Sequence, residues 1–161
     1  MANVRWLIFL FSTPLFVASC ASAGPRHSDS MCNAIAHFAE SAKVSVTRSV
    51  TLRGGWGGDT PDLIMTHDCV HSGYEPGKQL CDYLLPNTSW EFGQYNAEVA
   101  IACLDSAERR KLIRKLEQDE WPIKVTSSMQ QLKDKHILVT VSFSTSNLSV
   151  LILSATRSSS E

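Results

Sequence analysis

The apolar residues that begin the folded part of the chain recur at the spacing of a helix. Met31, Ala34, Ile35 and Phe38 are three or four positions apart, which places them on one face of an α-helix. The polar residues 28–30, Ser-Asp-Ser, precede this stripe and have side chains that can cap a helix N-terminus. We therefore expect a helix that starts near residue 30.

The pattern then changes to the period of a strand. Across residues 44–52, Val, Arg and Leu alternate with Ser and Thr, as in a strand with one buried face. The glycine-rich residues 54–58, Gly-Gly-Trp-Gly-Gly, predict a turn or loop. Residues 63–66 predict a second, short strand, and residues 67–77 predict a loop that contains a Glu-Pro-Gly turn.

Helix signals dominate the middle of the chain. Pro76 can open a helix, which we expect over residues 78–85 and which Pro86 would end. Ser89 can cap the next segment, whose apolar residues have helical spacing. Residues 98–104 also alternate between alanine and larger apolar residues, so a strand is the alternative there. The helical stripe consists of Phe92, Tyr95, Val99 and Cys103.

Residues 105–120 have the pattern of an amphipathic helix. Asp105 and Glu108 have the spacing of a capping box, and apolar residues gather near one face. Five basic and five acidic residues occupy the remaining positions, which favours a solvated helix surface over an anion-binding patch. The basic residues are Arg109, Arg110, Lys111, Arg114 and Lys115.

The last third of the chain predicts strands. Residues 123–126 begin one strand, and residues 136–143 and 148–155, rich in Val, Ile and Leu, predict an antiparallel hairpin. Residues 157–161 predict a frayed polar tail. Helices and strands in this order predict an α+β fold, in which helices pack on one face of an antiparallel sheet.

Length and charge restrict the class of protein further. The 161 residues suit a single domain, which we place at residues 31–156. The 15 Lys and Arg residues are balanced by 16 Asp and Glu, so a basic surface for nucleic acid is not expected. We expect neither nucleic acid nor a small-molecule cofactor as a partner.

The first residues of the chain have the composition of an export signal. Arg5 precedes the apolar residues 6–11 and 15–17, with Ser, Thr and Pro between the two apolar runs. The apolar stretch is shorter than the roughly 20 residues that a membrane-spanning helix requires. We therefore interpret residues 1–19 as a cleaved signal peptide.

Two cleavage sites compete after this segment. Residues 21–23, Ala-Ser-Ala, fit cleavage before Gly24 and would release a soluble periplasmic or secreted protein. Residues 17–20, Val-Ala-Ser-Cys, resemble the lipobox of bacterial lipoproteins. The resemblance implies that Cys20 is lipidated and anchors the protein to a membrane of the periplasm, with residues 20–30 as a short tether.

The four remaining cysteines predict two disulfides. An even number of cysteines in an exported domain indicates a disulfide framework, for which three pairings are possible. We favour Cys69 with Cys81, which closes a short loop, and Cys32 with Cys103, which joins two predicted helices. Reduced buried thiols and a zinc site are the alternatives, although the chain contains no CxxC pair.

One polar cluster is a candidate for metal binding or acid–base chemistry. His67, Asp68 and His71 flank Cys69, and two His residues at i and i+4 can share a metal ion if the segment is helical. The loop expected at these residues disfavours that geometry, so surface residues beside a disulfide are the simpler interpretation. We expect no cofactor.

The exposed aromatic residues point to binding rather than catalysis. The chain has no GxSxG or SxxK motif and no phosphate-binding glycine loop. Trp56 on the glycine-rich segment and Tyr74 are candidate contacts for a protein partner, whereas Trp90 and Tyr95 are expected in the core. An inhibitor- or immunity-type binding module of the cell envelope is therefore the leading hypothesis. An envelope hydrolase or metal-binding protein and a purely structural envelope lipoprotein are the alternatives.

Overall fold

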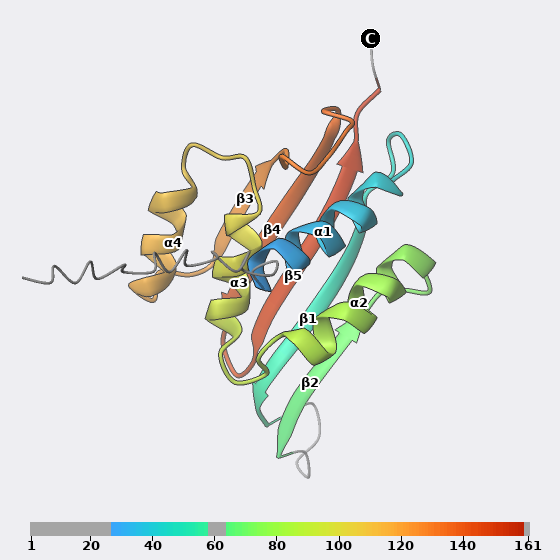
Figure 1. Cartoon of the computed structure of the whole chain (residues 1–161). Helices are drawn as coiled ribbons and strands as arrows, with labels where there is room; N and C mark the ends of the chain where they lie inside the picture. Colours follow the sequence, from blue (N-terminus) through green and yellow to red (C-terminus); the bar gives the residue numbers. More distant parts are fainter. Residues whose placement is uncertain (1–26, 58–63, 160–161) are drawn as a thin grey trace, which may run out of the picture.

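The computed structural model describes residues 27–57 and 64–159, which form one layer of helices on one antiparallel sheet. The helices are α1 (His27–Glu40), α2 (Glu75–Asn87), α3 (Gly93–Ala102) and α4 (Arg109–Glu117). The strands are β1 (Arg48–Trp56), β2 (Met65–Val70), β3 (Ile123–Ser127), β4 (Ile137–Thr145) and β5 (Ser149–Arg157). The sheet order is β2-β1-β5-β4-β3, and α1, α2 and α3 cover one face while α4 packs beside α3 (Figure 1). The predicted α+β class is confirmed.

The β4–β5 hairpin forms as predicted and lies in the centre of the sheet. Its register runs from Ile137 opposite Arg157 to Thr145 opposite Ser149. Alternate residues of each strand face the helices and are buried, because side chains on a strand point to opposite faces in turn. The buried residues of the hairpin are Ile137, Val139, Val141, Phe143, Leu151, Leu153 and Ala155.

The first helix supplies the other large part of the core. Its buried residues have the predicted helical spacing and include Met31, Ile35 and Phe38. The helix begins at His27, so the last part of the predicted tether belongs to it and the expected cap at residues 28–30 lies inside the first turn. The signal peptide, the lipobox and Cys20 lie outside the described residues.

The boundaries of β1 and β2 differ from those expected. β1 starts at Arg48, and Val44 makes only an isolated bridge to Arg157. The strand then continues through Gly54 and Gly55 to Trp56, where a turn was expected. β2 starts after the expected position and extends to Val70, so residues 67–70 of the expected loop belong to a strand. The two strands pair along their length, which overrides the local preference of the glycines.

The helices of the middle segment also differ in detail from their sequence pattern. α2 starts beside Pro76 as predicted but continues through Pro86. Residues 98–104 are helical up to Ala102, which decides against a strand. α3 turns Gly93, Asn96, Ala97, Ala100 and Ile101 inward. Of the predicted stripe, Cys103 is buried and Val99 packs against the core, whereas Phe92 and Tyr95 are exposed.

α4 is shorter than its pattern predicts. It spans Arg109–Glu117, and neither Asp105 nor Glu108 makes a side-chain cap. Leu116 is buried, and Leu112 and Ile113 pack against the core, so the predicted apolar face is confirmed. β5 extends one residue into the predicted polar tail, to Arg157.

Both predicted disulfides are present. Cys32 of α1 bonds with Cys103 after α3, with the two Cα atoms 5.1 Å apart. Cys69 of β2 bonds with Cys81 of α2, with the Cα atoms 5.5 Å apart. The first bond therefore joins two helices, and the second joins the edge of the sheet to the helix that covers it.

None of the helices in the described residues covers the second face of the sheet. Thr140 lies beside Thr126 on this face, and their hydroxyl oxygens are 2.8 Å apart. Arg53 and Asp68 form a two-contact ion pair across β1 and β2 on this face. Within residues 27–57 and 64–159, no helix is long and apolar enough to cross a bilayer.

Candidate functional site

Two tryptophans meet at one end of the sheet, the lower end in Figure 1. Trp56 is the last residue of β1, and Trp90 lies in the connection between α2 and α3. Their rings are edge to face, with centroids 4.9 Å apart and planes at 81°. The Trp56 side chain is nevertheless 62% exposed, so the contact fixes the ring without burying it.

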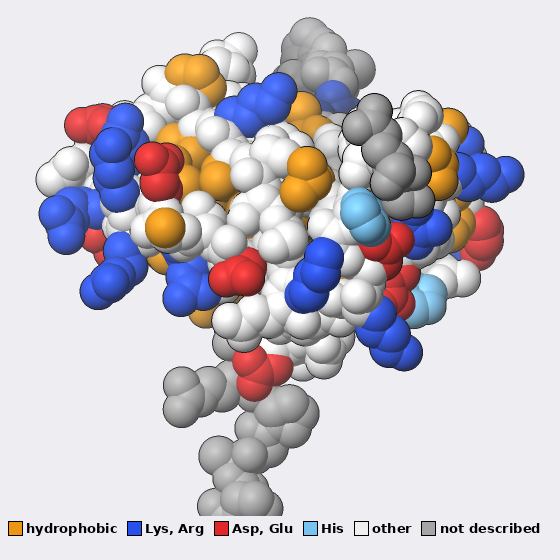
Figure 2. Space-filling model, turned by 90° about the horizontal axis from the view of Figure 1, so that it is seen from above, with side chains coloured by type: hydrophobic (Ala, Val, Ile, Leu, Met, Phe, Trp, Pro, Cys, Tyr) orange, Lys and Arg blue, Asp and Glu red, His pale blue; other side chains and the backbone are white. Residues whose placement is uncertain are grey.

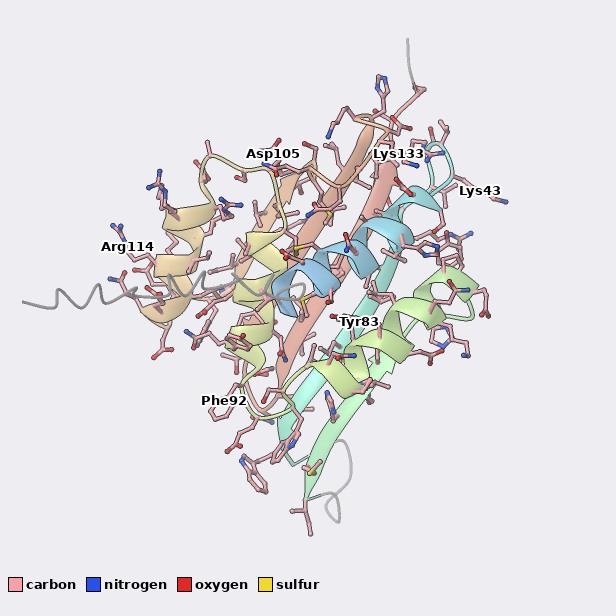
Figure 3. All side chains as sticks on the ribbon, viewed as in Figure 1. Lys43, Tyr83, Phe92, Asp105, Arg114 and Lys133 are labelled. Carbon is pink, nitrogen blue, oxygen red and sulfur yellow. A yellow bond between two sulfur atoms is a disulfide. The ribbon has the colours of Figure 1, made fainter. Side chains whose placement is uncertain are left out.

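Further apolar side chains extend this exposed surface. Met65 is paired with Trp56 across β1 and β2. Ile64 precedes Met65, and the Ile64 carbonyl oxygen accepts a hydrogen bond from the backbone N–H of Gly57. Phe92 lies two residues after Trp90 in the same connection and is 63% exposed. Figure 3 labels it at this end of the molecule. We call this surface, made of Trp56, Ile64, Met65, Trp90 and Phe92, the aromatic end.

The loop that carries Trp90 and Phe92 is held by close backbone contacts. A Cβ atom on Gly54 would lie 2.6 Å from the carbonyl oxygen of Trp90, so only glycine allows the loop to approach β1 this closely. Gly93 approaches β5 in the same way, because its Cβ would lie 2.3 Å from the Cβ of Ser149. The two glycines thus allow the segment between α2 and α3 to rest directly on the sheet.

Hydrogen bonds from a buried amide complete this loop. The backbone N–H of Ser89 donates to Asn96 Oδ1 at 3.0 Å, and Asn96 Nδ2 donates to the Ser89 carbonyl oxygen at 2.6 Å. The Ser89 hydroxyl accepts from the backbone N–H of Phe92 at 2.9 Å. Because Asn96 is buried in α3, these bonds fix the loop to a helix of the core, and the aromatic end is preorganised.

A pocket of about 590 Å³ opens beside the aromatic end. It lies between the start of α3, the chain after α4 and the turn end of the β4–β5 hairpin. Its lining combines aromatic rings with carboxylates, and Phe92 belongs both to the pocket and to the aromatic end. The lining residues are Glu91, Phe92, Gly93, Gln94, Tyr95, Glu98, Asp119, Trp121, Phe143, Thr145 and Ser149.

Two contacts define the walls of the pocket. Trp121 lies edge to face with Phe143, with ring centroids 5.4 Å apart, which anchors the Trp121 ring on a buried side chain of β4. Gln94 Nε2 donates to the Leu116 carbonyl oxygen at 2.8 Å and to Glu98 Oε1 at 3.3 Å. The Gln94 amide therefore links α3 to α4 and holds one of the pocket carboxylates.

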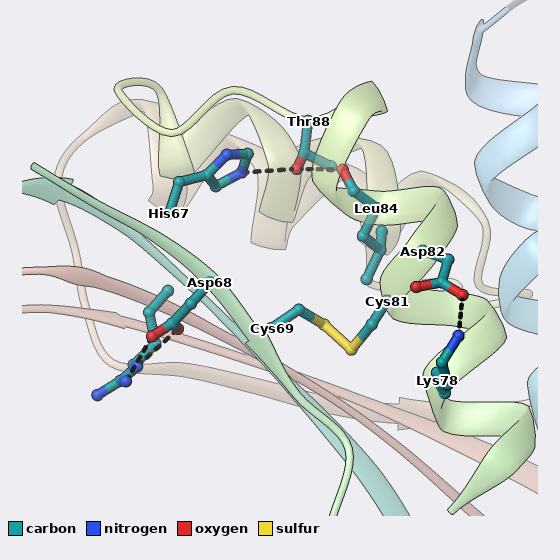
Figure 4. The surroundings of a disulfide bond; sticks show 9 residues. His67, Asp68, Cys69, Lys78, Cys81, Asp82, Leu84 and Thr88 are labelled. Atoms are coloured by element: carbon teal, nitrogen blue, oxygen red, sulfur yellow. Dashed lines mark hydrogen bonds and ion pairs between the residues drawn. A yellow bond between two sulfur atoms is a disulfide. The ribbon is translucent and has the colours of Figure 1, made fainter.

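The structure does not bring His67, Asp68 and His71 together. His67 and Asp68 lie on β2, so their side chains point to opposite faces of the sheet, as Figure 4 shows. Asp68 is held by Arg53 on the open face, whereas His67 Nε2 lies 3.4 Å from Thr88 Oγ1 on the helix side. Within the described residues, no group of three His, Cys, Asp or Glu side chains could hold a metal ion.

The surroundings of His67 favour the neutral form of its imidazole. The Thr88 hydroxyl donates to the Leu84 carbonyl oxygen at 2.6 Å, so its oxygen is left to accept from His67 Nε2–H. Burial lowers the pKa of His67 from its ordinary value of 6.5, and the nearby Asp68 carboxylate raises it to a smaller extent. The neutral imidazole is therefore the form that suits this position.

Tyr74, the second predicted partner contact, belongs to a packed cluster. Its hydroxyl donates to the Ser41 carbonyl oxygen at 2.9 Å, and its ring lies edge to face with Phe38. The Arg48 guanidinium stacks over the same ring at 4.7 Å from the centroid. The hydroxyl and the ring of Tyr74 are therefore both engaged by residues of the same chain, on a part of the molecule away from Trp56.

The basic residues of α4 form no uniform positive patch. In Figure 2, Lys and Arg side chains gather on the side where Figure 1 places α4, and Asp and Glu side chains lie among them. This view is from the end opposite to the aromatic end, and its hydrophobic side chains are scattered. The mixed charge agrees with the predicted solvated helix surface.

The sequence pattern identified Trp56 but not its neighbours. Trp90 and Tyr95 were expected in the core, yet Tyr95 is 53% exposed and lines the pocket. The sequence pattern singled out neither Trp121 nor Asp119, which also line the pocket. The available signal was the run of aromatic and acidic residues at positions 90–98, which a helical period places on an outer face.

The chain matches no protein-family model, and no curated protein or solved structure shows significant similarity to it.

Proposed function

We propose that this chain is a small exported binding module that captures a protein partner at the aromatic end. The observation that carries the proposal is the exposed Trp56 ring, which is fixed against the half-buried Trp90, with the exposed Ile64, Met65 and Phe92 in the same surface. Exposed tryptophan and phenylalanine side chains are costly in water, and aromatic residues are the most frequent anchors of protein interfaces.

Rigidity supports a binding role for this surface. The Asn96 hydrogen bonds and the close approach of Gly54 to Trp90 hold the rings in place in the free protein. A surface that is ordered before binding loses less conformational entropy when the partner docks. The aromatic end therefore suits occlusion or capture of a partner, as in inhibitor- and immunity-type proteins.

The cell envelope is the proposed location. The two disulfides are compatible with an exported protein, because such bonds persist in oxidising compartments. The lipobox-like residues 17–20 support an anchor at Cys20, which would hold the domain at a periplasmic membrane surface. The partner would then be a protein of the same compartment.

Paired capture experiments test the proposal. The immobilised protein, a Trp56→Ala variant and a Leu138→Ala variant are incubated with an envelope extract of the organism that produces the chain. Leu138 is a suitable control because it is an exposed apolar residue on the open sheet face, away from the aromatic end. Recovery of one stoichiometric protein by the wild type and the control, but not by Trp56→Ala, is expected. Equal recovery by all three, or no recovered protein, would overturn the proposal.

A further inference from the structure

The pocket beside the aromatic end has a negative, aromatic lining. Glu91, Glu98 and Asp119 line it, and no Lys or Arg does. Within the described part of the chain, none of these three carboxylates forms an ion pair. The basic residue nearest to Asp119 in sequence is Lys115. It forms an ion pair with Glu120 and not with Asp119. The charge of the pocket is therefore available to a ligand.

The aromatic walls add a second attraction for the same kind of ligand. Tyr95, Trp121 and Phe92 line the pocket, and the faces of aromatic rings attract cations. The same rings also pack well against methylene groups. A group that carries a positive charge at the end of an apolar stem satisfies both the carboxylates and the rings.

The size of the pocket is suited to an organic group. A volume of about 590 Å³ falls within the range of small-molecule sites and exceeds what a bare ion needs. The carboxylates come from different parts of the chain: Glu91 lies just before α3, Glu98 lies within α3, and Asp119 follows α4. The negative charge of the pocket is therefore not confined to one element.

We propose that this pocket binds a guanidinium or alkylammonium group, supplied by an Arg or Lys side chain of the protein partner. The inference rests on the proposed function, because it takes the cation to be part of the protein that docks at the aromatic end. Phe92 connects the two surfaces, so a partner seated on Trp56 and Phe92 places an adjacent side chain at the pocket. The Gln94 amide holds Glu98 through a 3.3 Å hydrogen bond, which keeps that carboxylate in position.

A titration with small cations tests the pocket without the partner. N-acetyl-arginine amide, N-acetyl-lysine amide and the neutral N-acetyl-citrulline amide are added to the full chain at matched ionic strength. The NMR signal of the Trp121 indole N–H, assigned with a Trp121→Phe variant, reports on binding. We expect saturable shifts with the two cations, at the ~mM affinity of such small ligands. Citrulline differs from arginine in charge but hardly in shape, and it is expected to cause no saturable shift.

Variants identify the carboxylates that bind. Glu98→Gln and Glu91→Gln are expected to weaken binding of the arginine compound about three- to tenfold each. Glu117→Gln removes the same charge from an exposed position of α4 outside the pocket and is the matched control. Amide NMR spectra show whether each variant remains folded. Equal shifts with citrulline, no shift with any compound, or equal weakening by Glu117→Gln would overturn the inference.

A partner experiment separates this inference from the proposed function. Partner capture by Glu98→Gln is compared with capture by Glu117→Gln, and a selective loss with Glu98→Gln supports a partner side chain as the source of the cation. If capture works but the titration fails, the aromatic end remains a binding surface and the inference about the pocket is wrong. If the titration works but no partner is captured, the pocket takes a free cationic molecule, and the protein source and the proposed function are both wrong.

Discussion

The carbonyl oxygen of Trp90 lies where a side chain on Gly54 would have to be, 2.6 Å from the position of its Cβ. This contact seats the loop between α2 and α3 on β1 and brings Trp90 to the ring of Trp56. The position of the exposed Trp56–Trp90 contact in the candidate site therefore depends on a crowded backbone contact.

Gly54→Ala is expected to destabilise the protein and to disturb the aromatic end. The added methyl group meets backbone atoms that cannot move without the whole loop, and such overpacking costs about 1–3 kcal/mol. Urea unfolding measures the loss, and the NMR signal of the Trp90 indole reports the displaced ring. Gly77→Ala is the control, because its nearest contacts are side-chain carbons at 3.2 Å. An equal loss in both variants would contradict this account.

The two disulfides are expected to differ in their contribution to stability. Cys32 and Cys103 are 71 positions apart, whereas Cys69 and Cys81 are 12 apart. In the chain-entropy model the longer loop stabilises by about 4 kcal/mol and the shorter loop by about 3 kcal/mol. Urea unfolding of the two Cys→Ala double variants at neutral pH tests the order. A larger loss on removing the Cys69–Cys81 bond would show that native contacts outweigh loop length.

His67 is expected to make stability depend on pH. Burial lowers its pKa in the folded state below the ordinary value of 6.5, so the unfolded chain binds a proton more readily. The stabilising contribution is then present above about pH 6.5 and is lost as the pH falls below it. NMR titration of the imidazole checks the direction of the shift.

A matched pair of variants isolates this effect. His67→Gln keeps a donor for Thr88 but cannot be protonated, so the loss of stability between neutral and mildly acidic pH should be smaller than in the wild type. His136→Gln makes the same change at an exposed histidine just before β4 and serves as the matched control. The same profile in wild type and His67→Gln would refute the assignment.

Intact-mass measurement tests the expected processing. A chain purified from the membrane fraction should begin at Cys20 and carry the added mass of acyl chains, because residues 17–20 resemble a lipobox. The same measurement with and without reduction should show four cysteines in two disulfides. A mature protein that starts at Gly24 without added mass would instead support the soluble alternative.

The hairpin and the first helix were predictable because their patterns are local. Alternation from Ile137 to Phe143 and helical spacing from Met31 to Phe38 each agree with the burial in the structure. The disulfide pairing was also predictable, because Cys69 and Cys81 close a short loop and the other two follow from it.

The candidate site was less predictable because its residues meet only in the folded chain. Gly54 has the local signal of a turn, yet it is a strand residue because β1 pairs with both β2 and β5. His67 and His71 have helical spacing but lie on or beside a strand, which separates them. The pocket combines α3, the chain after α4 and the β4–β5 hairpin, so the run at positions 90–98 contains only one of its walls.

The bond between Cys69 and Cys81 has a consequence for how copies of this protein meet. β2 is at the edge of the sheet and is paired on one side only, with β1. An edge strand of this kind can pair with a strand of a neighbouring molecule, which promotes domain swapping and fibril formation. Because the disulfide joins β2 to α2, β2 cannot leave its own sheet without α2 and replace the same strand of a second copy while the bond is intact. The bond therefore keeps the oxidised protein from swapping this strand on its own, even at high protein concentration.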